Sequence, residues 1–111
     1  MLNKKFDCKE IENYLEKIAE KYGLQLKKER WENSKVYFLK KDEDTIALIK
    51  LPYFPHEDKE RGICNIPEVD VYKAVDKQKL STLVKKISDV FKSPVLYMDR
   101  KRKTMERILP S

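Results

Sequence analysis

The chain has 111 residues, of which 41% are hydrophobic and 40% charged, and its formal net charge is +6. This length suits one domain with an ordinary core, and hydrophobic residues in periodic patterns exclude an intrinsically disordered chain. No stretch approaches the roughly 20 apolar residues of a membrane helix, and no apolar run typical of a signal peptide follows the N-terminal basic residues. Cys8 and Cys64 lack the spacing of a disulfide framework or a zinc knuckle, so free thiols are expected. These features favour a cytoplasmic protein.

The first helix is predicted over residues 7–22. Asp7 is a favourable N-cap, and Gly23 supplies the left-handed residue at which many helices end. The apolar stripe of this helix consists of Cys8, Ile11, Leu15, Ile18 and Tyr22. The opposite face, which includes Glu12 and Glu16, is mixed in sign and is predicted to be solvated surface.

Three strands are predicted after this helix, over residues 24–32, 35–41 and 45–51, with polar turns between them. Trp31 is out of phase with the alternation of the first strand and predicts a bulge or a bend there. The third strand is apolar on both faces, which indicates a central place in the sheet. A short further strand is predicted near residues 69–73.

A second helix is predicted over residues 77–92, because its apolar residues again follow a helical period and Ser93-Pro94 stops it. Its buried stripe consists of Leu80, Leu83, Val84, Ile87 and Phe91. A last strand is predicted over residues 95–100. Residues 101–111 are predicted to form a basic C-terminal tail, with apolar residues at helical spacing, beyond a single compact domain over residues 1–100.

The resulting order, α-β-β-β-(β)-α-β, predicts an α+β domain with two helices packed on one face of a mainly antiparallel sheet. The residues predicted for the centre of its core are Ile11, Leu15, Ile18, Leu48, Leu83, Val84 and Ile87.

Catalysis is constrained by the residue types that are scarce. His56 is the only histidine, so every serine–histidine or cysteine–histidine dyad would have to use it. It lies in a polar segment bounded by prolines and is predicted to be an exposed loop residue. Gly23 and Gly62 are the only glycines, so the sequence contains no glycine-rich loop that could cradle the phosphates of ATP or NAD.

A metal-dependent nuclease is the second alternative. Such enzymes need clustered carboxylates and often a lysine, and Glu68, Asp70 and Lys73 come closest. On a strand the two carboxylates would share a face and the lysine would point away. The order helix, three strands, helix, strand resembles the core of restriction-type nucleases, but no carboxylate stands two residues before Lys50 on the expected third strand. We therefore predict a protein that is not an enzyme and that holds no metal or cofactor.

Nucleic-acid binding is the preferred function, because the net charge is concentrated near the C-terminus. Residues 85–111 hold eight Lys or Arg against three acidic residues. Four consecutive cations follow the last predicted strand, and two lysines seven residues apart lie on one flank of the second helix. The residues predicted to contact the phosphate backbone, without sequence readout, are Lys85, Lys92, Arg100, Lys101, Arg102 and Lys103.

A protein-binding role is the first alternative. Residues 52–68 form a long irregular loop in the predicted order, and such loops are often functional. Tyr53 and Phe54, fenced by prolines on both sides, are candidates for a rigid aromatic anchor at an interface. A small protein of this kind suits an inhibitor or adaptor of the type carried by phages and mobile elements.

Overall fold

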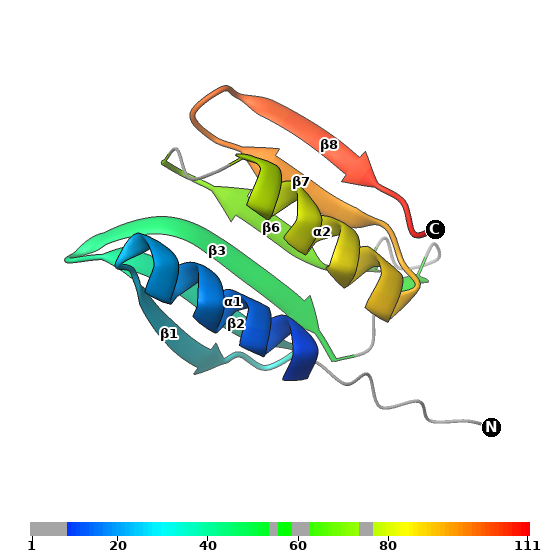
Figure 1. The fold of residues 1–111 in the computed structure, drawn as a ribbon. Helices are drawn as coiled ribbons and strands as arrows, with labels where there is room; N and C mark the ends of the chain where they lie inside the picture. The colour runs from blue at the N-terminus through cyan, green and yellow to red at the C-terminus, as the bar shows by residue number, and fades with distance from the viewer. Residues whose placement is uncertain (1–8, 54–55, 59–62, 74–76) are drawn as a thin grey trace.

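The computed structural model describes residues 9–53, 56–58, 63–73 and 77–111. Across these residues, two helices accompany a six-stranded sheet and a separate two-stranded hairpin (Figure 1). A single compact domain with a mostly antiparallel sheet is therefore confirmed. The predicted cap Asp7 and the two cysteine side chains lie outside what the structure describes.

Helix α1 (Lys9–Tyr22) and helix α2 (Lys77–Phe91) each bury one apolar stripe, as the sequence predicts. The stripe of α1 consists of Ile11, Leu15 and Ile18, and that of α2 consists of Leu80, Leu83, Val84, Ile87 and Phe91. All of these side chains belong to one hydrophobic cluster. Neither helix is long and apolar enough to cross a membrane, as judged over the described residues.

Both helices end in the same backbone motif. Gly23 has φ 65°, and the N–H of the next residue donates to the carbonyl of Ala19 at 2.7 Å. Lys92 has φ 53°, and the N–H of the next residue donates to the carbonyl of Ser88 at 3.3 Å. Glycine adopts this left-handed conformation at little cost in free energy because it has no Cβ. In Lys92 the same conformation places the Cβ close to the following carbonyl oxygen.

The six strands of the main sheet lie in the order β1-β2-β3-β6-β7-β8. Their bounds are β1 Gln25–Arg30, β2 Ser34–Lys41, β3 Asp44–Pro52, β6 Glu68–Val71, β7 Val95–Asp99 and β8 Thr104–Ile108. All neighbours are antiparallel except β6 and β7, which are parallel and are joined through α2. Strand β3 lies inside the sheet, as its apolar sequence predicts.

Two local predictions were wrong. Residues 104–108 do not belong to a helical tail, because they form β8 and pair with β7 along their whole length. Strand β1 ends at Arg30 and not near residue 32, so the predicted bulge within it is absent, and the chain bends at residues 32–33 after the strand. The irregularity of the sheet lies instead between Leu39 and Lys40, where the register of β2 against β3 shifts.

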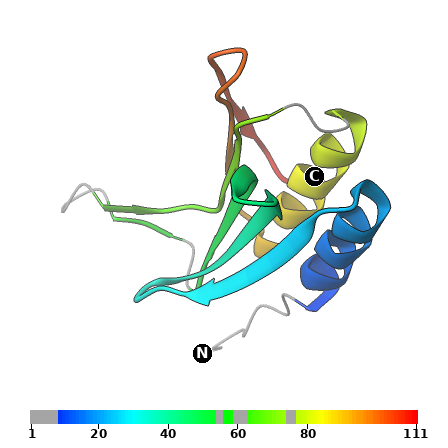
Figure 2. The ribbon, with the colours of Figure 1, turned by 90° about the vertical axis from the view of Figure 1, so that its left-hand side faces the viewer.

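The two faces of the sheet differ in what covers them. Figure 2 shows α1 and α2 on the same side of the sheet. Tyr37, Ile49 and Val69 are fully buried in the cluster that includes both helices. Leu48, which was predicted to lie in this core, is only partly buried, because it alternates with Ala47 and Ile49 and points to the other side.

Segment 52–68 is not a plain loop. Strand β4 (His56–Asp58) and strand β5 (Ile63–Asn65) pair within it as an antiparallel hairpin. In Figure 2 this hairpin extends away from the sheet on the side opposite the helices. It is inserted between β3 and β6, which are neighbours in the sheet.

Substitutions at Lys92 and Gly23, the two left-handed residues that end the helices, test the free-energy cost of this backbone conformation. Lys92→Gly is expected to raise the free energy of unfolding by about 0.5–1 kcal/mol, because glycine adopts positive φ without the Cβ clash. Gly23→Ala is expected to lower it by about 1 kcal/mol. A Cβ at Gly23 would meet no heavy atom within 4 Å, so this variant reports conformation alone. Urea unfolding measures both, and a stabilising Gly23→Ala or a destabilising Lys92→Gly would contradict the cap assignment.

Candidate nucleic-acid interface

The four consecutive cations of the sequence lie in the turn between β7 and β8, which we name the basic turn (residues 100–103). Asp99 fixes its backbone, because one carboxylate oxygen accepts the N–H groups of Lys101 and Arg102 at 3.1 Å each. Lys103 closes the turn with φ 58°. The turn stands at one end of the sheet (Figures 1 and 2). Its cations are therefore presented on an ordered backbone.

Arg100 is anchored to the neighbouring strand β6. Its backbone N–H donates to the carbonyl of Val71 at 2.7 Å, and its Nη2 lies 3.3 Å from Asp70 Oδ2. Its guanidinium also lies 6.0 Å from the ring centroid of Tyr72. The side chain of Asp70 is only 8% exposed, and its second oxygen has no hydrogen-bond partner among the described residues. Arg100 therefore compensates a nearly buried carboxylate.

The other three cations of the basic turn are more available. Arg102 Nε lies 3.7 Å from Asp99 Oδ2, and the arginine side chain of this pair is 55% exposed. Lys101 and Lys103 are exposed and form no ion pair with any described residue. A phosphate group could therefore bind to this turn without displacing a buried ion pair.

A cleft of about 520 Å³ lies beside the basic turn, between α2 and the β7–β8 pair. Asp99, Arg102 and Glu106 line it together with Tyr97 and Ser81. Burial raises the pKa of the Tyr97 hydroxyl, and the negative charges of Asp99 and Glu106 act in the same direction. The charged side chains that line the cleft are thus mixed in sign, and its carboxylates do not favour a phosphate.

The structure does not bring Lys85 and Lys92 together with the basic turn. Lys85 Nζ donates to the carbonyl of Leu109 at 2.9 Å and lies 3.5 Å from Asp89, so it holds the C-terminal residues against α2. Lys92 ends α2. Because α2 connects two parallel strands, it runs antiparallel to β7, and Lys92 lies at the end of the sheet opposite the basic turn (Figure 1). The six predicted residues therefore occupy three separate places.

Of the residues predicted for protein binding, only Tyr53 is described. It follows β3, is 39% exposed and donates its backbone N–H to the carbonyl of Asn33 at 3.1 Å. Phe54 lies outside the described residues. His56 begins β4 and is paired with Asn65, but its side chain is not described.

The carboxylates considered for a nuclease lie on β6. Glu68 and Asp70 alternate along this strand and share a face, as predicted. Lys73 is engaged elsewhere, because its Nζ lies 2.8 Å from Asp44. Within residues 9–53, 56–58, 63–73 and 77–111 no group of three histidine, cysteine or acidic side chains could hold a metal ion.

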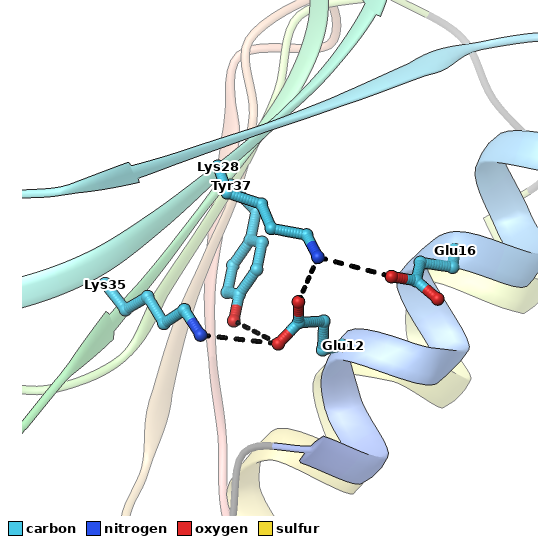
Figure 3. Close-up of polar contacts among 5 residues, drawn as sticks. All are labelled: Glu12, Glu16, Lys28, Lys35 and Tyr37. Carbon is cyan, nitrogen blue, oxygen red and sulfur yellow. Dashed lines mark hydrogen bonds and ion pairs between the residues drawn. The ribbon is translucent and has the colours of Figure 1, made fainter.

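One polar cluster was not predicted from the sequence. Glu12 of α1 contacts Lys28 of β1, and its Oε2 accepts from Lys35 Nζ at 3.3 Å and from the Tyr37 hydroxyl at 3.4 Å (Figure 3). Lys28 also reaches Glu16 at 3.3 Å. The side chain of Glu12 is only 18% exposed, although its helix face was predicted to be solvated. The cluster fastens α1 to the β1–β2 pair.

No protein-family model matches the sequence, and a search of curated proteins finds no match. The geometry described above is therefore the basis for the functional proposal.

Replacing Glu12 tests the cluster through the pH dependence of stability. The Lys28 ammonium, with help from Lys35, holds the pKa of Glu12 below its ordinary value, although burial opposes this. The Glu12 carboxylate therefore binds a proton more tightly in the unfolded chain than in the folded protein. Its contacts with the lysines stabilise the fold at pH values above the ordinary glutamate pKa. This stabilisation is lost as the pH falls through the pKa of Glu12 in the folded protein. Glu12→Gln is expected to cost about 1–3 kcal/mol at neutral pH.

The difference in unfolding free energy between wild type and Glu12→Gln should shrink as the pH is lowered below about 4. Glu16→Gln is the matched control, because this more exposed glutamate contacts only Lys28 within the cluster, and a much smaller effect is expected. A loss in Glu12→Gln that stays constant between neutral and acidic pH would contradict the electrostatic role of Glu12.

Proposed function

We propose that this protein binds nucleic acid through phosphate contacts made by the basic turn, without reading the sequence and without catalysing a reaction. The observation that carries the proposal is that Lys101 and Lys103 are exposed cations without an acidic partner among the described residues. Both lie in the turn in which Asp99 accepts the backbone N–H groups of Lys101 and Arg102. Ordered, uncompensated cations favour phosphate binding because little side-chain pairing is lost on contact.

The overall charge supports the same function. The chain carries 25 Lys and Arg against 19 Asp and Glu, and this excess attracts a polyanion over longer distances. A cytoplasmic location, where nucleic acid is abundant, belongs to this proposal.

Protein binding through segment 52–68 is the rival function. It is favoured by the hairpin of β4 and β5, which extends from the domain, and by Tyr53, which is 39% exposed near the hairpin base. Nucleic-acid binding is preferred because the basic turn combines charge, exposure and backbone order at one place.

Neutralising the two unpaired lysines tests the proposed function. Lys101→Gln with Lys103→Gln is expected to weaken binding to duplex DNA of unrelated sequences by the same factor. Each lost phosphate contact should also reduce the slope of log K against log salt by about 1. The control combines Lys17→Gln with Lys92→Gln, which removes the same charge from α1 and from the far end of α2.

Fluorescence anisotropy with labelled duplexes measures both variants over a range of salt concentrations. The wild type is expected to bind with a dissociation constant of about 1–100 μM at physiological salt. Equal salt slopes for the two double variants would show that the basic turn is not the contact. No binding by the wild type in this range would reject the function and leave protein binding as the better candidate.

A further inference from the structure

The face of the sheet that the helices do not cover, here called the open face, carries an exposed aromatic pair. Trp31 is 42% exposed, and its indole N–H donates to Glu29 Oε1 at 3.4 Å. Its ring centroid lies 6.4 Å from that of Phe38, with the planes tilted by 56°. Phe38 and Glu29 lie on the open face because their chain neighbours Tyr37 and Lys28 contact α1.

The cross-strand register continues this pair into a row of residues across the sheet. The row runs through the directly paired residues Phe38, Leu48, Asp70, Met98 and Met105. Directly paired residues share one face of the sheet. The cluster that contacts the helices is formed without Phe38, Leu48 and Met98, and Met105 is 67% exposed. Partly exposed apolar side chains therefore lie on the open face at Phe38 and Leu48 and again at Met98 and Met105, with the ion-paired carboxylate of Asp70 between the two groups.

Cations surround this surface and outnumber its carboxylates. By register, or by alternation along a strand, the open face has the cations Lys27, Lys40, Lys50, Arg100 and Arg107 and the carboxylates Glu29, Glu68 and Asp70. Two of the carboxylates pair with two of these cations, since Asp70 lies 3.3 Å from Arg100 and Glu29 lies 3.5 Å from Lys27. The remaining cations, Lys40, Lys50 and Arg107, still outnumber Glu68. Aromatic rings beside an excess of positive charge complement a nucleic acid, because the rings can stack on its bases and the cations can contact its phosphates.

The open face is continuous with the basic turn. Arg100 begins the turn and lies on the open face, where it binds Asp70 and lies over the ring of Tyr72, which is 39% exposed. A nucleic-acid strand bound by phosphate contacts at the turn can therefore continue across this row of paired residues towards Trp31.

We propose that the open face binds single-stranded nucleic acid, with bases stacked on Trp31 and Phe38 and with phosphates on the surrounding cations. The inference rests on the proposed function and adds to it the form of the ligand. A duplex keeps its bases within its own stack, whereas a single strand offers them to aromatic rings. Stacking tolerates any base, so this mode agrees with binding that does not read sequence.

The fluorescence of Trp31 tests the proposal directly, because it is the only tryptophan in the chain. The full chain is titrated at about 100 mM salt with an oligothymidylate of about 12 nucleotides, and with an abasic oligomer of the same charge. The oligothymidylate is expected to quench Trp31 emission and to bind about fivefold or more tightly than the abasic oligomer. The abasic oligomer is expected to leave the emission nearly unchanged.

Two variants separate base stacking from phosphate contact, with binding followed by anisotropy of labelled oligomers. Trp31→Leu is expected to reduce the preference for the oligomer with bases and to leave the salt slope unchanged, since no charge is removed. Phe38→Leu removes the ring but keeps an apolar side chain, and it is expected to reduce the quenching of Trp31. The matched control is Tyr53→Leu, which removes an aromatic ring of similar exposure outside the open face row and should retain the preference.

Equal affinity for both oligomers with unchanged Trp31 emission would overturn the stacking proposal. In that case the function proposed for the basic turn would still stand if the lysine double variant lowered the salt slope. Absence of binding to either oligomer and to duplex DNA would reject both proposals together.

Discussion

The parallel pairing of β6 and β7 is the constraint on which the arrangement of this domain depends. Parallel neighbours cannot be joined by a tight turn, so the chain crosses from one to the other through α2. Their register places Val71 opposite Asp99, and Arg100 therefore emerges beside Asp70 and Tyr72. The basic turn follows at once, and its position is thus fixed by strand pairing rather than by the local sequence of cations.

Local patterns in the sequence were sufficient to predict the two helices. Residues at steps of three and four can bury one stripe only if the chain is helical, and Gly23 marks the end of the first helix by its freedom at positive φ. Strands β1, β2 and β3 could also be predicted from the sequence, because short polar turns separate them. Residues 104–108 were misread, since their apolar spacing suits a short helix and only pairing with β7 makes them a strand.

The candidate site was predicted only where its determinants are local. A run of four cations is visible in the sequence, and it lies in an exposed turn. The separation of Lys85 and Lys92 from this turn depends on the direction of α2, and the burial of Glu12 depends on Lys28 and Lys35 from other elements. The open face could not be predicted either, because it needs the register of strands that are distant in sequence.

A map of the surface that contacts nucleic acid is the most direct test of binding by the basic turn and the open face. Amide chemical shifts of the full chain can be followed by NMR during titration with the oligothymidylate at about 100 mM salt. We expect the largest changes in residues 99–104 and around Trp31 and Phe38, with small changes on the outer face of α1. Changes confined to Tyr53 and the β4–β5 hairpin, or none at saturating oligonucleotide, would contradict binding at these two surfaces.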